Sequence, residues 1–225
     1  MTSVAARLAE IRARIAAACG RVDREPATVR LVAVCKKQSD DRIAEAIAAG
    51  QRVFGDNYVQ ELDRHHARFP DPSLEWHLIG HLQSNKARRA AEAAAMIHSV
   101  DSLKLVRTMA PWAAGRSAPL PILVEVSLAG EVTKTGCSRA EVASIVRYAH
   151  ESKVIQPAGL MCMPPPDRPA RPYFVELRQI RDRLRDTLGL PLPELSMGMS
   201  GDFEEAIEEG ATLVRIGTAV FGARS

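Results

Sequence analysis

Short apolar runs rich in β-branched residues alternate along this chain with longer segments rich in Ala, Glu and Arg. Such short runs are typical of buried strands, and the longer segments carry apolar residues at the three- and four-residue spacing of a helix. Regular alternation of the two predicts βα units around a parallel sheet. The first amphipathic stretch, residues 4–19, precedes these units and predicts an extra N-terminal helix that ends at Gly20.

Eight strands can be placed on this pattern, each followed by a helix or turn. Eight such units are the count of a (β/α)8 barrel, although an open doubly wound sheet gives the same alternation. Because no unit is left over after the eighth strand, we expect an α/β fold, a single (β/α)8 TIM barrel forming one domain over residues 1–225. The expected strands are residues 31–36, 52–55, 76–80, 96–100, 122–127, 157–163, 195–197 and 213–217. The expected helices are residues 41–49, 58–68, 84–95, 103–114, 139–151, 171–188 and 202–209, with a short turn after Thr218.

The composition narrows the class of protein. A hydrophobic fraction of 46% is typical of a folded domain and excludes a mainly disordered chain. The chain has 30 Lys and Arg against 27 Asp and Glu, which leaves a net charge of only +3. The four cysteines form no C-x-x-C pair, which argues against a zinc or disulfide scaffold and suits a reducing compartment. No apolar stretch approaches the roughly 18 residues of a membrane span. We therefore expect a cytoplasmic protein that binds neither nucleic acid nor membrane.

A lysine pair stands at the end of the first expected strand. The apolar run 31–35 ends directly in Lys36 and Lys37, at the C-terminal end of a strand, where barrels of this type place their working face. Partial burial favours the neutral amine of a lysine, which is a nucleophile towards carbonyl groups. Alternation along a strand prevents both lysines from pointing inward. The alternative is that both simply mark a strand end that meets solvent.

Two glycine-hydroxyl turns follow the seventh and eighth expected strands. The first contains Gly198, Ser200 and Gly201, and the second contains Gly217 and Thr218. Phosphates in (β/α)8 barrels commonly bind between these two loops, where glycines let backbone N–H groups approach a ligand closely. The alternative is two ordinary helix caps.

Arg215 adds a third element to this pattern. It stands two residues before Gly217 on the same strand face, so it could reach a ring nitrogen and leave that nitrogen unprotonated. Lys36, a phosphate cradle and Arg215 together describe a barrel that holds a phosphorylated aldehyde. A pyridine that is kept neutral is a weaker electron sink.

Other polar residues give weaker signals. His77 and His81 are four apart but straddle a strand end, without the H-E-x-x-H pattern of a zinc-binding helix, so we expect polar residues at the barrel mouth and no metal site. Lys86, Arg88 and Arg89 form a basic cluster on an expected helix, most often a solvated face. The cluster leaves open a barrel that binds phosphorylated metabolites or nucleic acid non-covalently.

Several ordered segments make the chain similar to the pyridoxal 5′-phosphate homeostasis proteins, the YggS/PROSC family, whose fold resembles the N-terminal barrel of alanine racemase. The matches run nearly from end to end. The segments are LVAVCK at 31–36, FGDNYVQE at 54–61, WHLIGHLQSNK at 76–86, HSVDS at 98–102, GLM at 159–161, LSMGMS at 195–200 and VRIGTAVFG at 214–222.

This resemblance implies a set of cofactor-binding residues, with no catalytic residue and no metal ligand. Lys36 would carry pyridoxal 5′-phosphate (PLP) covalently as an internal aldimine, and Arg215 would face the pyridine nitrogen. The other implied contacts are with the phosphate, from Ser200, Gly217 and Thr218, and with the pocket wall, from Asn57, Met161 and Met199.

The resemblance also implies a function in intracellular PLP homeostasis, as a cofactor carrier or regulator without established turnover, with PLP-dependent apoenzymes as partners. We expect a monomer. The alternative is a PLP-dependent enzyme similar to an amino-acid racemase. In alanine racemase a second acid/base comes from a separate β domain, and this sequence ends at Ser225, just past the eighth expected strand.

Overall fold

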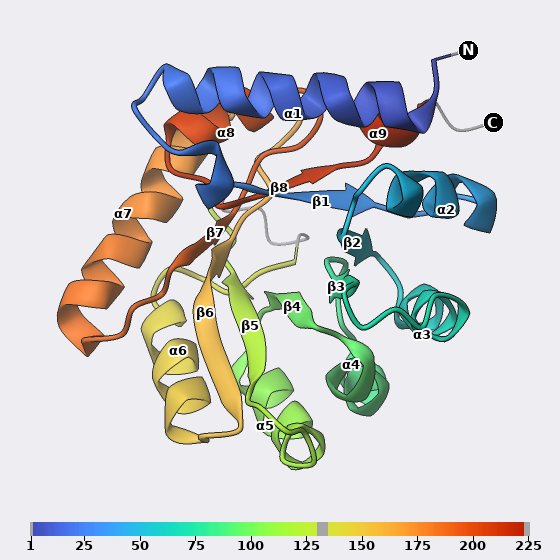
Figure 1. The fold of residues 1–225 in the computed structure, drawn as a ribbon. Helices are drawn as coiled ribbons and strands as arrows, with labels where there is room; N and C mark the ends of the chain where they lie inside the picture. The colour runs from blue at the N-terminus through green and yellow to red at the C-terminus, as the bar shows by residue number, and fades with distance from the viewer. Residues whose placement is uncertain (1, 130–134, 223–225) are drawn as a thin grey trace.

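Eight parallel strands form a closed barrel in chain order (Figure 1). The computed structural model describes residues 2–129 and 135–222. The first and last strands pair from Arg30 opposite Leu213 to Ala33 opposite Ile216, so the sheet closes on itself and the expected (β/α)8 barrel is confirmed over the open sheet. The strands are β1 (Arg30–Val34), β2 (Val53–Asp56), β3 (Glu75–Leu78), β4 (Met96–Val100), β5 (Leu120–Glu125), β6 (Ile155–Met161), β7 (Glu194–Ser196) and β8 (Leu213–Ile216).

Helices surround the barrel, and each of the eight strands is followed by one. The extra N-terminal helix α1 (Val4–Gly20) is confirmed, and it packs against α8 and α9, so the two ends of the chain lie side by side (Figure 1). None of the helices in the described ranges is long and apolar enough to cross a membrane. The remaining helices are α2 (Asp40–Ala48), α3 (Val59–Arg68), α4 (Ala87–Ala93), α5 (Leu103–Ala113), α6 (Val142–Glu151), α7 (Arg171–Leu188), α8 (Phe203–Glu208) and α9 (Thr218–Phe221).

Many element boundaries differ from those expected by a few residues, and three of these differences show how the chain is built. The first strand ends at Val34 instead of residue 36, because the chain turns there and the Gln38 N–H donates to the Cys35 carbonyl at 2.8 Å. The expected helix 84–95 starts with one 3-10 turn, η2 (Ser84–Lys86), before α4. The sixth strand begins earlier than residue 157. Pro157 lies inside it beside a register shift in its pairing with β5, and such a bulge accommodates a residue that cannot donate to the ladder.

The core has two layers. Between the strands and helices lies a large aliphatic cluster that includes the buried Phe54 and Trp76, whose rings stack at 4.9 Å. Inside the barrel lies a smaller apolar cluster formed by Val32, Val53, Ile79, Met96, Leu123, Ala158, Met161 and Leu213. The inside of the barrel is not wholly apolar, because four polar side chains are also buried there, namely His77, His98, Ser196 and Arg215. One of these four buried side chains, Arg215, also lines the candidate site.

Candidate functional site

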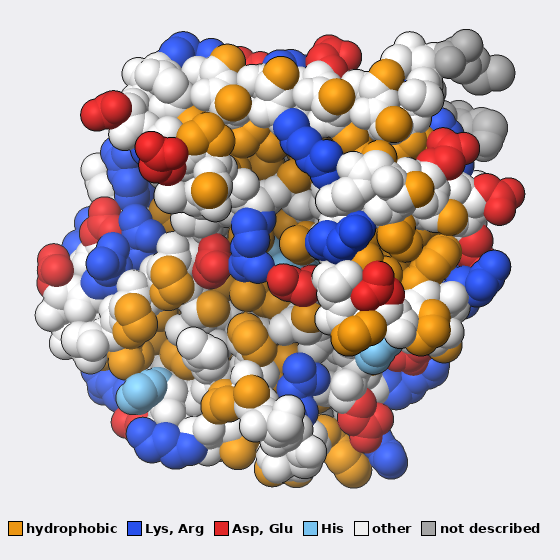
Figure 2. Space-filling model, viewed as in Figure 1, with side chains coloured by type: hydrophobic (Ala, Val, Ile, Leu, Met, Phe, Trp, Pro, Cys, Tyr) orange, Lys and Arg blue, Asp and Glu red, His pale blue; other side chains and the backbone are white. Residues whose placement is uncertain are grey.

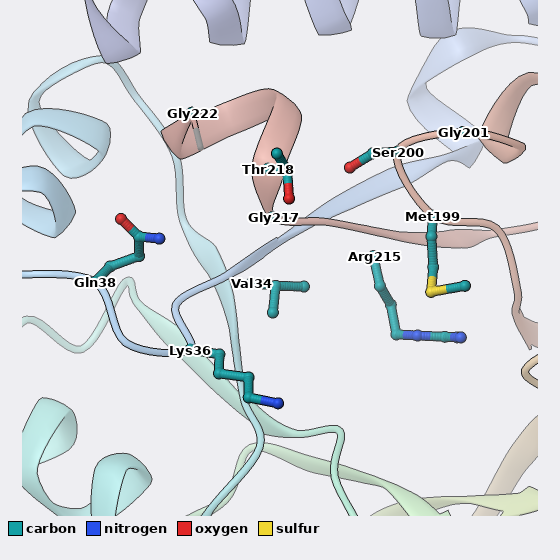
Figure 3. Close-up of a pocket in the computed structure, with 10 residues that line it drawn as sticks. All are labelled: Val34, Lys36, Gln38, Met199, Ser200, Gly201, Arg215, Gly217, Thr218 and Gly222. Atoms are coloured by element: carbon teal, nitrogen blue, oxygen red, sulfur yellow. The ribbon is translucent and has the colours of Figure 1, made fainter. Parts of the chain in front are cut away.

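A cavity of about 320 Å³ lies where β1, β7 and β8 end (Figure 3). We call it the main cavity. Among the described residues no acidic side chain lines it, and this lining favours an anionic ligand. It is lined by Val34, Lys36, Gln38, Met199, Ser200, Gly201, Arg215, Gly217, Thr218 and Gly222. Six of the sequence-predicted site residues are thus brought together, namely Lys36, Met199, Ser200, Arg215, Gly217 and Thr218.

Lys36 enters the main cavity from the turn after β1. The turn begins where the Cys35 N–H donates to the Gly55 carbonyl, the last contact of this segment with β2. Lys36 is half-buried, and its Nζ lies 5.9 Å from the centre of the Tyr58 ring. Lys37 is exposed and has a left-handed φ of 58°. The two lysines therefore face different surroundings, and Lys36 alone of the pair lines the cavity.

The turn after β7 is held open by a glycine with a positive φ. Gly198 has φ 92°, and a Cβ there would stand 2.6 Å from the Ala206 Cβ and 2.9 Å from the Phe203 Cα, so no larger residue fits without a shift. The turn is closed by Asp202, whose Oδ1 accepts from the Met199 N–H at 2.6 Å. Asp202 stands at the N-cap position of α8, but its carboxylate is used within the turn and forms no cap hydrogen bond with the helix, and Ser200 is left facing the cavity.

Ser200 and Thr218 lie together on the wall opposite Lys36 (Figure 3). Neither hydroxyl forms a hydrogen bond with the described part of the chain, so the two residues are not ordinary helix caps. The backbone N–H groups of Ser200, Gly201, Thr218 and Ala219 likewise find no acceptor among the described residues. Unused hydroxyl and N–H donors that converge on one space form an anion cradle. We use this name for the two turns below.

Arg215 is 4% exposed and reaches the main cavity from inside the barrel. Its two terminal nitrogens donate to the Ser196 Oγ at 2.6 Å and to the Cys162 carbonyl at 3.0 Å. Burial lowers the pKa of its guanidinium. Within the described residues no carboxylate lies within ion-pair distance of it, so its hydrogen bonds go to neutral groups alone, while Glu125 and Asp202 act on its charge from farther away. A buried cation of this kind favours an uncharged or anionic ligand atom in front of it.

A chain of polar contacts continues from Arg215 across the barrel interior. The Ser196 Oγ lies 2.9 Å from His98 Nδ1, His98 Nε2 lies 2.9 Å from His77 Nδ1, and His77 Nε2 lies 3.1 Å from Glu75 Oε2. The expectation that His77 lies at the barrel mouth is wrong. It is fully buried, because alternation along β3 turns Glu75 and His77 inward on the same face.

The other histidine of that pair is placed as expected. His81 is about half exposed, and its Nδ1 lies 3.5 Å from Asp101 Oδ2. The described residues contain no group of three or more His, Cys, Asp or Glu side chains that could hold a metal ion. The four cysteines are free and buried.

Two of the residues expected in the pocket wall lie elsewhere. Asn57 lines a second cavity of about 350 Å³ on the neighbouring loops, together with Tyr58, His81 and Lys86. Met161 is fully buried in the apolar cluster inside the barrel and does not line the main cavity. The cavity wall is therefore supplied mainly by β1, β7, β8 and the turns that follow them.

The basic cluster after β3 is largely neutralised. The Arg88 Nε lies 3.0 Å from Glu92, and Arg89 pairs with Asp63. On the face shown in Figure 2, basic and acidic side chains are interspersed and no broad patch of one sign gathers. These pairings argue against the hypothesis that the basic cluster binds nucleic acid.

Some lining residues were missed by the sequence reasoning. Val34 stands two residues before Lys36 in the first expected strand, a same-face spacing that the sequence offered, whereas Gln38 follows in the turn after β1. Gly222 and the Cys162 carbonyl come from segments that carry no local signal for this site. His98 and Ser196 were present in segments already noted, but their contact joins β4 to β7 and depends on the closed barrel.

Comparison with known proteins decides the family. Residues 7–225 match the family model described as alanine racemase, N-terminal domain. The pyridoxal phosphate homeostasis protein of Pseudomonas aeruginosa is 41% identical over 224 residues, which cover 100% of this chain and 97% of that relative. This chain belongs to the pyridoxal phosphate homeostasis protein family. The resemblance noted in the sequence is thereby confirmed.

Solved structures agree with this membership of the pyridoxal phosphate homeostasis protein family. The structure of PipY from Synechococcus elongatus with PLP bound is 37% identical and aligns with a TM-score of 0.85, covering 98% of this chain and 100% of PipY. Alanine racemase from Corynebacterium glutamicum aligns with a TM-score of 0.74 at 14% identity, covering 98% of this chain but 61% of the racemase. The racemase comparison supports the barrel fold alone.

Proposed function

We propose that this protein binds PLP in the main cavity and takes part in intracellular PLP homeostasis by holding and releasing the cofactor. The observation that carries the proposal is the convergence of the Lys36 amine, the anion cradle and the buried Arg215 on one cavity, whose described lining contains no acidic residue. The names of the curated relatives and the PLP-bound structure of PipY support it.

The chemical groups of PLP match the three parts of the main cavity. Its phosphate is a dianion that suits the hydroxyls of Ser200 and Thr218 and the free N–H groups beside them. When bound, PLP supplies an aldehyde that captures amines. We infer that the Lys36 nitrogen bonds to the aldehyde carbon while the carbonyl oxygen leaves as water, which gives a covalent Schiff base on Lys36. Water reverses this linkage, so it suits a protein that releases its ligand.

Arg215 would face the pyridine nitrogen in this arrangement. A guanidinium does not give up its proton, so it donates a hydrogen bond to that nitrogen and leaves it neutral. A neutral pyridine withdraws electrons weakly, which suits binding more than chemistry at a captured amino acid.

The cavity wall supports binding in preference to racemisation. Racemisation needs an acid or base on each face of the substrate carbon, and Lys36 is the one amine among the lining residues that the structure describes. Glu125, a buried carboxyl whose pKa burial raises, is not part of that lining.

We further propose that residues 1–225 act as one PLP-binding domain, as a monomer in the cytoplasm, and pass PLP to PLP-dependent apoenzymes. The exposed large apolar side chains among the described residues are scattered along the chain, which is typical of a surface without a large apolar interface.

An absorbance titration tests the proposed function. PLP added to the purified protein should give a visible band that Lys36→Ala lacks and that the matched variant Lys37→Ala retains. Lys37 is the control because it is adjacent in sequence, exposed and outside the cavity lining. Loss of the band in both variants, or in neither, would overturn the assignment of Lys36.

A further inference from the structure

The polar chain inside the barrel is unexplained by PLP binding itself. We call it the interior chain and define it as Glu75, His77, His98, Ser196 and Arg215. Only Arg215 lines the main cavity. The three middle members are fully buried, and the inside of a barrel is ordinarily filled by branched aliphatic side chains. Four polar side chains buried in such a place require a reason.

The two ends of the interior chain fix the direction of its hydrogen bonds. Arg215 can only donate, so its N–H donates to the Ser196 Oγ. An ionised Glu75 can only accept, so the His77 Nε2–H donates to it.

Between these ends one arrangement satisfies every contact when both histidines are neutral. The Ser196 hydroxyl donates to His98 Nδ1, and the His98 Nε2–H donates to His77 Nδ1.

The surroundings support this pattern of protonation. Burial lowers the pKa of His77 and lowers that of His98 well below its usual value, so both are neutral near pH 7. The hydrogen bond from His77 lowers the pKa of Glu75, which keeps that carboxylate ionised. Within the interior chain, His77, His98 and Ser196 then each donate one hydrogen bond and accept one.

We propose that Ser196 and His98 are positioning residues, which hold the guanidinium of Arg215 in the orientation that faces the PLP ring nitrogen. The proposal rests on the proposed function, since it concerns how that function's arginine is held. The interior chain does not deliver protons to the cavity, because Arg215 keeps its proton and ends the chain as a donor. It acts as a support that runs from β3 through β4 and β7 to β8.

The support matters because, in the described residues, no carboxylate lies within ion-pair distance of Arg215 and could hold its guanidinium in place. A long flexible side chain with one remaining contact, to the Cys162 carbonyl, could rotate away from the ring nitrogen. The Ser196 Oγ removes that freedom, and His98 in turn fixes the rotation of the serine hydroxyl.

The direct test uses PLP labelled with ¹⁵N in its ring, because the chemical shift of that nitrogen reports its protonation. Wild-type protein at pH 7 should show the shift of a neutral pyridine. In Ser196→Ala the shift should move towards the protonated value, and PLP release should be about tenfold faster, the usual effect of losing a hydrogen bond to a buried charge. Ser99→Ala is the matched control, since Ser99 is an equally buried serine whose Oγ donates to the Gly80 carbonyl outside the interior chain.

A second pair of variants separates positioning from packing. His98→Asn keeps an acceptor near the position of Nδ1 and should retain the wild-type shift more fully than His98→Leu. A lower melting temperature with an unchanged ¹⁵N shift and release rate in Ser196→Ala would overturn the positioning role. If wild-type protein gives no PLP signal, the proposed function itself has failed, which is a different result.

One measurement needs no variant and no cofactor. In ¹⁵N spectra of the unliganded wild-type protein, His77 and His98 should both carry their proton on Nε2 and have a bare Nδ1. A proton on Nδ1 of His98 would reverse the interior chain and overturn the proposal even if a variant failed to fold.

Discussion

The two ends of this barrel treat charge in opposite ways. At the N-terminal end of the strands Arg30 lies 3.1 Å from Glu75 and 3.0 Å from Glu194, so each charge has a partner. At the C-terminal end Lys36 and Arg215 line a cavity in which the structure describes no acidic lining residue. The ion pairs neutralise the charges at the N-terminal end of the barrel. The cations at the C-terminal end have no ion-pair partner among the described residues and favour the binding of an anion.

This difference in charge pairing indicates which end of the barrel binds an anionic ligand. Burying a cation without a partner costs stability, so it is retained where a ligand provides the compensation. The same barrel therefore divides its polar residues between a structural end and a binding end, and the interior chain connects them.

Removing the two hydroxyls of the anion cradle should give the largest effect on binding. Ser200→Ala combined with Thr218→Ala should weaken PLP binding at least about 100-fold, because each lost hydrogen bond to a charged group contributes about 1.5–3 kcal/mol. Pyridoxal, which lacks the phosphate, should lose little affinity. Equilibrium titrations of both ligands against both proteins check this, and equal losses for the two ligands would show that the turns do not hold the phosphate.

Acid should destabilise the fold through the interior histidines. Burial lowers the pKa of His77 and of His98 in the fold, so the unfolded chain, where histidine titrates near 6.5, binds protons that the native state excludes. The free energy of unfolding should therefore fall as pH drops below about 6.5, by at most about 1.4 kcal/mol per pH unit for each histidine. Glu125, whose pKa burial raises, acts in the opposite direction.

Thermal melts at pH 7 and pH 5 measure this effect. His98→Asn removes one titrating group and leaves Glu125 in place, so its melting temperature should drop less between the two pH values than that of the wild type. A drop of the same size in both proteins would mean that His98 is not held neutral in the fold.

Breaking the closed end should give the smallest effect. Arg30→Met leaves Glu75 and Glu194 without their shared cation, but the Arg30 side chain is about one-third exposed and solvent screens the pair. We expect a loss of about 1 kcal/mol, or about 2–4 °C in melting temperature, with PLP affinity unchanged. A large loss of PLP affinity would show that the two ends are not separate in function.

Much of the fold followed from the sequence, because its signals are local. The alternation of apolar runs and amphipathic segments predicted all eight strands, and the glycine-hydroxyl turns after β7 and β8 predicted the anion cradle. Lys36 was found because a barrel exposes its strand ends at one face. Each of these inferences needs only a few neighbouring residues.

The interior chain could not be found in this way. Its contacts join β3, β4, β7 and β8, so they depend on the register of a closed sheet. His77 was misplaced for the same reason, since its inward direction follows from where β3 begins. The earlier start of β6 depends on a bulge beside Pro157, which a pattern of apolar residues does not reveal.

The central claim is that the main cavity holds PLP on Lys36. Borohydride reduction of the PLP-loaded protein, followed by peptide mass spectrometry, tests it most directly, because reduction makes the linkage permanent. The account predicts a pyridoxyl group on Lys36 and none on Lys37, its exposed neighbour. Modification spread over exposed lysines, with Lys36 unmodified, would contradict it.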